Sequence, residues 1–269
     1  MADAESSDGV GRLLRDWRER RRLTQLDLAL DAGISARHLS FVETGRSKPG
    51  RQMLLAVAEQ LQIPFRDRNH LLLAAGHAPA FPERDLTDPE LEPVREALDR
   101  ILTAHEPYPA LVFDRAWNHV AANRPMAEAA AWADVDPALL EPPVNILRLG
   151  LHPRGMAPLV VNLGHWHAHF LGRLDRQIAL SGGDDLKALR DEVAAYPIPD
   201  DDRGSTRDAD GQEMLGPVRL RTPEGSELSF FGMYAAFDTP FEVTASELAI
   251  ELLYPANRAT SEALERGAP

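Results

Sequence analysis

The chain has 269 residues and no cysteine, so it can form neither disulfide bonds nor a zinc site with cysteine ligands. It has no apolar stretch as long as a membrane-spanning helix requires. Its first residues, Met-Ala-Asp-Ala-Glu-Ser-Ser-Asp, are acidic and polar, which is unlike a secretory signal. A nucleophile elbow and a phosphate-cradling glycine-rich loop are also missing. These absences predict a cytoplasmic protein without membrane contact, and they give no support to an enzyme.

Basic charge is scarce overall, because 29 Lys and Arg face 42 Asp and Glu for a net charge of −13. The imbalance is unevenly distributed. Residues 1–78 contain 12 basic and 10 acidic residues (+2), whereas residues 79–269 contain 17 and 32 (−15). A Pro-rich segment at residues 77–82 separates the two compositions. We therefore predict two domains, 1–78 and 79–269, of which only the first has a patch suited to a polyanion.

A local pattern of helix signals occupies the first domain. Thr24 stands at an N-cap position directly before an apolar period. Gly33 ends that helix as a residue free to adopt a left-handed conformation. Ser35 then caps a second helix, whose residues Leu39 and Val42 are spaced to face inward. Two helices joined by a short Gly turn predict a DNA-binding helix-turn-helix, whose second helix enters the major groove.

Residues 13–61 resemble the lambda-repressor-like (XRE) family. The resemblance is carried by Leu23-Thr24-Gln25, Ala32-Gly33-Ile34-Ser35, Val42-Glu43-Thr44-Gly45 and Pro49. It implies an N-terminal all-α five-helix lambda-repressor-like domain, and Pro64 to Ala75 indeed has the pattern of a fifth helix. One helix-turn-helix covers only a half-site, so we expect a homodimer on a palindromic operator in double-stranded DNA.

The resemblance also implies which residues meet DNA. Arg37 is the expected base reader, because its planar guanidinium can pair two-pronged with guanine. Ala36 and Phe41 would contact thymine methyls, although Phe41 could instead pack inward. The full set of expected DNA-binding residues is Thr24, Gln25, Ser35, Ala36, Arg37, His38, Ser40, Phe41, Arg46, Lys48 and Arg51, with Ser40, His38, Arg46, Lys48 and Arg51 assigned to phosphates. By the same resemblance, Glu43 pairs with Arg18.

The second domain shows strand patterns on both sides of a helical middle. Two short strands, 110–114 and 117–123, are expected as a hairpin through Asp114-Arg115, and a loop is expected at Ile198–Met214. The other predicted elements are helices at 87–105, 159–180 and 184–196, a helix from Met126 onward, and strands at 218–221, 227–237 and 248–254. Such strands can close one antiparallel sheet covered by helices, so we predict an α+β domain.

This half resembles the ligand-binding domain of MmyB-like transcription regulators, a PAS-like fold. The similar stretches are 109–126, 145–153, 162–176 and 218–255, whereas a Trp-x-x-His-Asp-Val stretch of the family is replaced here by Asp210-Gly211-Gln212-Glu213-Met214. The resemblance implies an apolar pocket for a fatty acid or similar acyl ligand, and we expect no required cofactor. Its expected wall is Phe113, Trp166, Phe170, Phe230, Tyr234 and Phe237, and the expected head-group residues are Arg148, His152 and His169.

Two other interpretations of the second domain stay open. His165, His167 and His169 alternate, which suggests a metal-dependent sensor or an enzyme-like domain. On a helix, however, only His165 and His169 share a face, and two imidazoles without an acidic third ligand are weak evidence for zinc. We therefore expect no metal site. Alternatively, the aromatic residues are ordinary core, and the domain serves only dimerisation.

Overall fold

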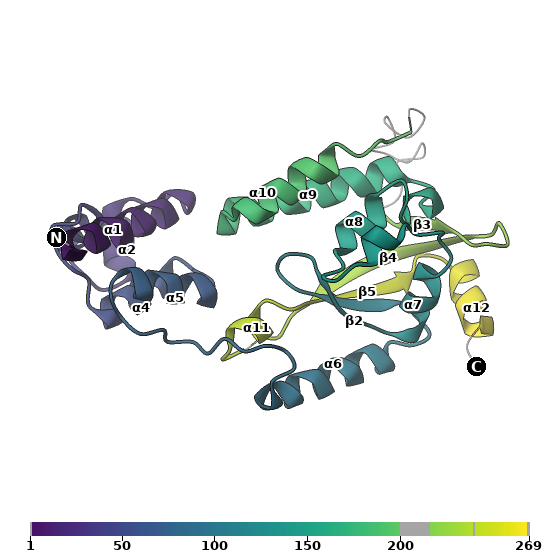
Figure 1. The fold of residues 1–269 in the computed structure, drawn as a ribbon, viewed down its shortest axis with the longest axis horizontal. Helices are drawn as coiled ribbons and strands as arrows, with labels where there is room; N and C mark the ends of the chain where they lie inside the picture. The colour runs from purple at the N-terminus through teal and green to yellow at the C-terminus, as the bar shows by residue number, and fades with distance from the viewer. Residues whose placement is uncertain (1, 200–215, 239, 268–269) are drawn as a thin grey trace. The chain divides into compact units, whose positions relative to one another are not determined.

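The computed structural model describes residues 2–199, 216–238 and 240–267, with side chains from residue 9 onward. The chain forms two compact units. The helical unit comprises Met1–Asp85, Ala179–Ser181 and Thr239–Ser246, and the sheet unit comprises Leu86–Ile178, Gly182–Asp238 and Glu247–Pro269. Both are drawn in Figure 1. Most of the expected 198–214 loop, including the departure at Asp210–Met214, lies outside the described residues.

The helical unit confirms the predicted all-α domain. Its elements are α1 (Ala2–Arg20), α2 (Gln25–Asp31), α3 (Ala36–Glu43), α4 (Arg51–Gln60), α5 (Phe65–Ala74) and the short α11 (Val243–Ser246). Leu14, Leu28, Leu39 and Leu54 are buried together in one core, so the inward positions of four helices meet. Gly11 of α1 is required there, because a Cβ at this position would lie 2.4 Å from the Val42 carbonyl oxygen of α3. The missing side chain lets α1 and α3 approach closely.

The sheet unit contains one antiparallel sheet, as predicted. Its strands follow the order β2-β1-β5-β4-β3. Their bounds are β1 (Ala110–Phe113), β2 (His119–Ala122), β3 (Val218–Arg221), β4 (Glu227–Ala235) and β5 (Ala249–Pro255). The first hairpin joins the C-terminal strand through pairs such as Val112 with Ile250. The strands before the helical middle of the domain and those after it thus form one sheet.

Helices cover both faces of this sheet, which completes the α+β arrangement (Figure 1). They are α6 (Glu92–Ala104), α7 (Arg124–Ala130), α8 (Ile146–Leu151), α9 (Leu163–Ser181), α10 (Asp184–Ala194) and α12 (Arg258–Gly267), with short 3-10 turns at Pro89–Leu91, Pro137–Leu140 and Ala157–Leu159. Val112 and Ile250 pack with α6, whereas Phe113 packs with α8, α9 and α10. Successive residues of β1 point to opposite faces of the sheet and therefore pack into two different cores.

Several element boundaries differ from the predictions. The helix expected from Leu159 begins at Leu163, because Val160 instead forms a β-bridge with Leu220. The strand expected from Trp117 begins at His119, because Trp117 is buried with a left-handed φ of 67°, a conformation that a regular strand excludes. Helices α8 and α12 were not predicted.

Candidate DNA-reading helix and ligand pocket

Local capping interactions determine where α2 and α3 begin. The Thr24 hydroxyl accepts a hydrogen bond from the Asp27 backbone N–H (3.1 Å), and the Asp27 carboxylate accepts one from the Thr24 N–H (3.1 Å), which completes a capping box. Ser35 caps α3 by accepting from the His38 N–H at 3.1 Å. Gly33 connects the two helices with a φ of 65°. The hydroxyls of Thr24 and Ser35 are therefore committed to the helix ends.

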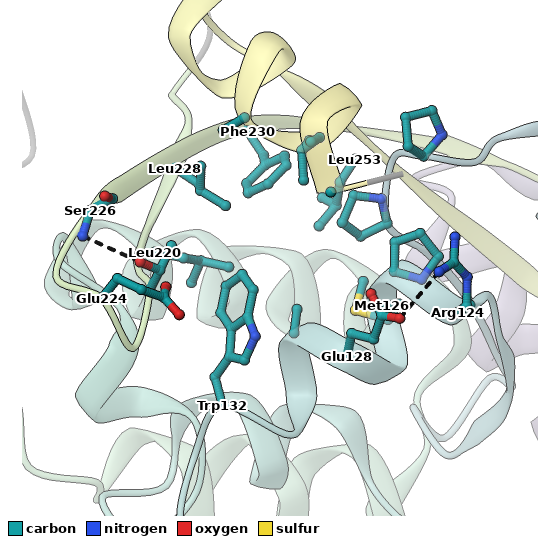
Figure 2. A pocket seen from close by; sticks show the side chains of 18 of the residues that line it. Arg124, Met126, Glu128, Trp132, Leu220, Glu224, Ser226, Leu228, Phe230 and Leu253 are labelled. Atoms are coloured by element: carbon teal, nitrogen blue, oxygen red, sulfur yellow. Dashed lines mark hydrogen bonds and ion pairs between the residues drawn. The ribbon is translucent and has the colours of Figure 1, made fainter. Parts of the chain in front are cut away.

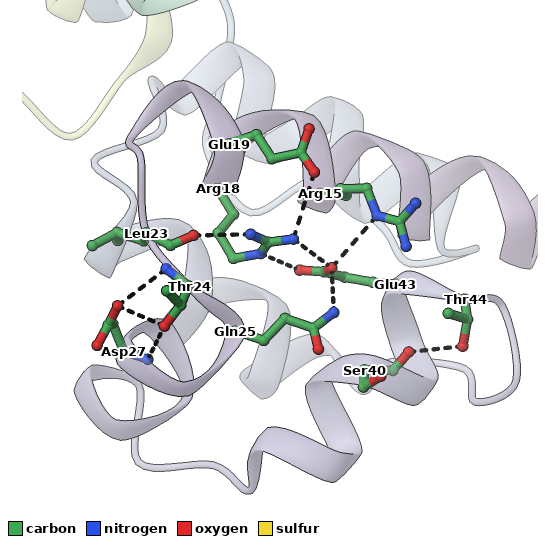
Figure 3. A network of polar contacts seen from close by, with 10 residues as sticks. All are labelled: Arg15, Arg18, Glu19, Leu23, Thr24, Gln25, Asp27, Ser40, Glu43 and Thr44. Carbon is green, nitrogen blue, oxygen red and sulfur yellow. Dashed lines mark hydrogen bonds and ion pairs between the residues drawn. The ribbon is translucent and has the colours of Figure 1, made fainter.

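A buried carboxylate joins α1, α2 and α3 (Figure 3). Arg18 Nε and Nη2 donate to the two Glu43 carboxylate oxygens at 2.7 and 2.9 Å, which confirms the pair expected from the resemblance. Gln25 Nε2 donates to the same carboxylate at 2.8 Å. Arg18 Nη1 also donates to the Leu23 carbonyl at 2.8 Å, which anchors the segment before α2. The network holds α3 at a defined angle to its neighbours.

The electrostatics keep this network ionised. Burial opposes the charge on Glu43, but hydrogen bonds from Arg18 and Gln25 outweigh burial and lower the pKa of its carboxyl. The hydrogen bond to Glu43 raises the pKa of the Arg18 guanidinium. Arg15 adds a longer ion pair, with its Nε 3.7 Å from Glu43. Removing one partner would leave the other charge buried and uncompensated.

The expected DNA-binding residues differ in their surroundings. Arg37, Arg46, Lys48 and Arg51 are exposed, whereas Ala36 packs partly against the core of the helical unit. The guanidinium carbon of Arg37 lies 5.3 Å from the centre of the half-buried Phe41 ring, one turn further along α3. His38 and Ser40 are also half-buried, and Gln25 is engaged with Glu43. Contact of these residues with DNA stays a prediction.

An apolar pocket of about 360 Å³ lies within the sheet unit. Trp166 and Phe170 of α9 line it, as expected for the ligand wall, and residues of α7, α8 and the sheet complete it. Leu140, which is 50% exposed, lines it as well. Among the described lining residues, His119 and Glu251 are the ionisable ones. The volume is at the lower end of the roughly 300–1,000 Å³ typical of ligand pockets.

The sheet unit also contains a second pocket, of about 330 Å³ (Figure 2). Phe230, Leu228 and Trp132 point into it, and the Arg124–Glu128 pair lies at one side. The two pockets share four lining residues, which are Met126, Met156, Leu220 and Leu253. They are therefore adjacent spaces separated by flexible or aliphatic side chains.

The remaining expected wall residues lie outside the first pocket. Phe113 stacks on Trp117 at 4.9 Å within a core cluster, and Phe230 lines the second pocket. Phe237 packs against the α6 cluster. Tyr234 is 39% exposed, and its ring lies 3.2 Å from the guanidinium carbon of Arg173. Trp166 and Phe170 are thus the expected wall residues that line the first pocket, with ring centres 4.6 Å apart.

The three expected head-group residues do not line either pocket. Arg148 of α8 forms a two-pronged ion pair with Glu192 of α10, at 2.8 to 3.1 Å. The His152 ring packs edge-on against Tyr196, and its Nδ1 accepts from the Arg154 N–H. His169 lies beside Trp166 and Phe170, and burial lowers the pKa of its imidazole. Arg148 and His152 are thus engaged with residues in and directly after α10, whereas His169 contacts side chains of its own helix.

The alternating histidines separate as their helical spacing requires. The His167 ring donates to the Val193 carbonyl at 2.8 Å and so joins α9 to α10. Its side chain is buried, at 8% exposure. In the described part of the chain, no group of three or more His, Asp or Glu side chains is arranged to hold a metal ion. No helix within the described ranges is long and apolar enough to cross a bilayer.

Sequence reasoning overlooked Glu251 and Arg173. Glu251 of β5 lines the first pocket and is only 5% exposed. Burial raises the pKa of its carboxyl to about 7, against an opposing effect of Arg173. Burial lowers the pKa of the Arg173 guanidinium to about 10. The available signal was a single acidic residue in an apolar strand, Ile250-Glu251-Leu252, whose alternation places it on the face opposite its neighbours.

Comparisons with known proteins match the two parts of the chain to different families. Residues 94–266 match the MmyB-like transcription regulator ligand binding domain, and residues 14–67 match a helix-turn-helix family. The chain is 34% identical over 103 residues to the uncharacterized HTH-type transcriptional regulator RghRB of Bacillus subtilis (strain 168), a match that covers 38% of this chain and 66% of that protein. The crystal structure of the clp gene regulator ClgR from Corynebacterium glutamicum matches over 38% of this chain and 95% of its own, with 24% identity and a TM-score of 0.24.

The fold and the comparisons define the class as a transcription regulator with a helix-turn-helix and a ligand-binding domain. Because the first match covers more than half of the chain, the protein belongs to the family of MmyB-like transcription regulators.

Proposed function

We propose that the protein is a homodimeric, sequence-specific regulator of transcription that acts in the cytoplasm. Its helical unit binds double-stranded DNA, and its PAS-like sheet unit senses a small apolar ligand. The observation that supports DNA reading best is α3, which Glu43 holds against α1 and α2 while Arg37 stays exposed. A guanidinium presented near the start of a reading helix can pair with a guanine edge.

A gel-shift titration with the DNA upstream of the protein's own gene tests this part. We expect Arg37→Ala to weaken specific binding by about 1–3 kcal/mol and to relax sequence preference at one base pair of each half-site. Arg100→Ala is the matched control, because Arg100 is exposed on α6 of the sheet unit. Equal affinity and selectivity of wild type and Arg37→Ala would contradict the proposal.

The pocket of about 360 Å³ supports ligand sensing. Trp166, Phe170 and aliphatic side chains offer an apolar wall for an acyl chain such as that of a fatty acid. A ligand can control DNA binding only by binding two arrangements of the dimer with different affinity. No resident cofactor is required by this scheme.

Native mass spectrometry of the full chain tests this part independently. We expect a co-purified small molecule that dissociates on denaturation and whose addition changes the affinity for the operator. Ala130→Phe should reduce its occupancy, because Ala130 lines the pocket and the larger side chain would fill it. A protein free of small molecules, with no operator response to added acyl compounds, would instead favour a dimerisation role.

A further inference from the structure

Glu251 is a buried carboxylate that faces an apolar pocket. It lies in the middle of β5, paired with Leu111 of β1 and Tyr234 of β4, and both Glu251 and Leu111 line the pocket. Gly232 of β4 leaves room for the carboxylate, because a Cβ there would lie 3.3 Å from Glu251 Oε1. The side chain therefore fits against the sheet, and Glu251 is only 5% exposed.

In the described part of the chain, Glu251 forms neither a hydrogen bond nor an ion pair. Buried charges in proteins are normally paired or hydrogen-bonded, because desolvating an unpaired carboxylate is costly. Proton uptake reduces that cost, and burial accordingly raises the pKa of Glu251 to about 7. The pocket thus presents a carboxylate that a hydrogen-bond donor would stabilise.

Arg173 of α9 is the nearby opposite charge, but it is held elsewhere. Its guanidinium carbon lies 3.2 Å from the Tyr234 ring centre, 4.5 Å from that of Trp117 and 5.5 Å from that of Phe113. Its Nη1 is buried and has no hydrogen-bond partner among the described residues, and Arg173 does not line the pocket. Aromatic rings therefore surround the guanidinium of Arg173, whereas the carboxylate of Glu251 faces the pocket.

Resting on the ligand-sensing role proposed above, we propose that Glu251 binds the ligand's head group and selects a hydrogen-bond donor, an ammonium or a hydroxyl, over a carboxylate. An ammonium would form a desolvated, charge-assisted bond with the ionised Glu251. A hydroxyl could donate to either form of it. A carboxylate would instead place two like charges in one apolar space. The head group thus differs from that of the fatty acid expected from the resemblance, while the apolar chain is retained.

The test uses the full-length protein and three probes that share one chain, octylamine, octan-1-ol and octanoate, measured by isothermal titration calorimetry at pH 7.5. We expect octylamine to bind at least about tenfold more tightly than octanoate, which corresponds to about 1.4 kcal/mol. Glu251→Gln should remove most of this preference while affecting octan-1-ol little, because the amide oxygen still accepts a hydrogen bond. Glu227→Gln, at an exposed position of β4, is the matched control.

Two results would overturn the head-group assignment. Octanoate could bind at least as tightly as octylamine, which would point to Arg173 as the anchor. Alternatively, Glu251→Gln could weaken all three probes equally, which would make Glu251 a structural residue. Ala130→Phe separates these outcomes from failure of the pocket itself, because blocking the pocket should weaken all three probes together. Probe binding that Ala130→Phe leaves unchanged would contradict the pocket proposed as the sensing site.

Discussion

Arg18 of α1 and Glu43 at the end of α3 form a buried two-pronged ion pair, with N–O distances of 2.7 and 2.9 Å. The two residues are 25 positions apart, so the pair connects α1 to α3. Gln25 of α2 donates to the same carboxylate. The orientation of α3 is therefore coupled to the stability of the helical unit.

Removing one partner of this pair should be strongly destabilising. We expect Glu43→Ala to lower the free energy of unfolding by about 3–5 kcal/mol, because the Arg18 charge would stay buried without a partner. The double variant Arg18→Met with Glu43→Leu should recover most of that loss, since apolar side chains can replace a buried ion pair. Urea denaturation followed by circular dichroism measures both. Glu19→Ala is the control, because this side chain is 61% exposed and should change stability by less than about 0.5 kcal/mol.

Two glycines of α1 should respond oppositely to alanine. A Cβ at Gly11 would lie 2.4 Å from the Val42 carbonyl oxygen, so Gly11→Ala must push α1 away from α3. We expect a loss of about 1–3 kcal/mol and weaker operator binding, because α3 would move with its neighbours. At Gly9 nothing lies within 4 Å of the added Cβ, so Gly9→Ala should gain about 0.5–1 kcal/mol from helix propensity. Equal stabilities of the two variants by thermal denaturation would contradict the close approach.

The exposed basic residues after α3 should contribute to affinity through phosphates. We expect Arg46→Ala to weaken binding to specific and non-specific DNA by similar factors and to reduce the slope of log K against log salt by about 1. Arg37→Ala should instead change specificity. Fluorescence anisotropy at several salt concentrations distinguishes the two effects. An unchanged salt slope in Arg46→Ala would remove this residue from the phosphate contacts.

Glu251 should make stability depend on pH near neutrality. Its pKa of about 7 in the folded protein exceeds the ordinary value of 4.5, so the folded state holds the proton more tightly. The resulting stabilisation is complete below pH 4.5 and is lost as pH rises to about 7, a change on the order of 3 kcal/mol. Arg173 on α9 and His119 on β2 also face this region, and burial lowers the pKa of both.

The difference between wild type and Glu251→Gln isolates this contribution, because both proteins keep Arg173 and His119. Urea denaturation from pH 4 to pH 8 should show the wild type losing stability relative to the variant as pH rises. A difference that stays constant across this range would contradict the raised pKa.

The helix-turn-helix was predictable because its signals are local. Thr24 and Ser35 bond to backbone groups three residues away, and Gly33 adopts the left-handed φ that its position requires. Hydrophobic spacing likewise located α9 and α10. The start of α9 was less predictable, since the bridge between Val160 and Leu220 depends on a strand about 60 residues further on.

The candidate ligand site was only partly predictable for the same reason. Apolar spacing identified Trp166 and Phe170, which lie one turn apart on α9 and line the pocket. It could not assign Arg148, because the ion pair with Glu192 depends on how α8 packs against α10. It also could not identify Glu251, because strand alternation gives two faces without stating which one borders a cavity.

The sequence by itself determined the fold class and the helices of the helix-turn-helix, since caps, turn glycines and helical spacing act within a few residues. Tertiary structure alone decided that β1 pairs with β5, which places Glu251 beside Leu111. Both residues therefore line a pocket that residues of α7, α8 and α9 complete. The burial of its carboxylate results from that packing, and it makes an ordinary strand glutamate the group that we propose selects the ligand.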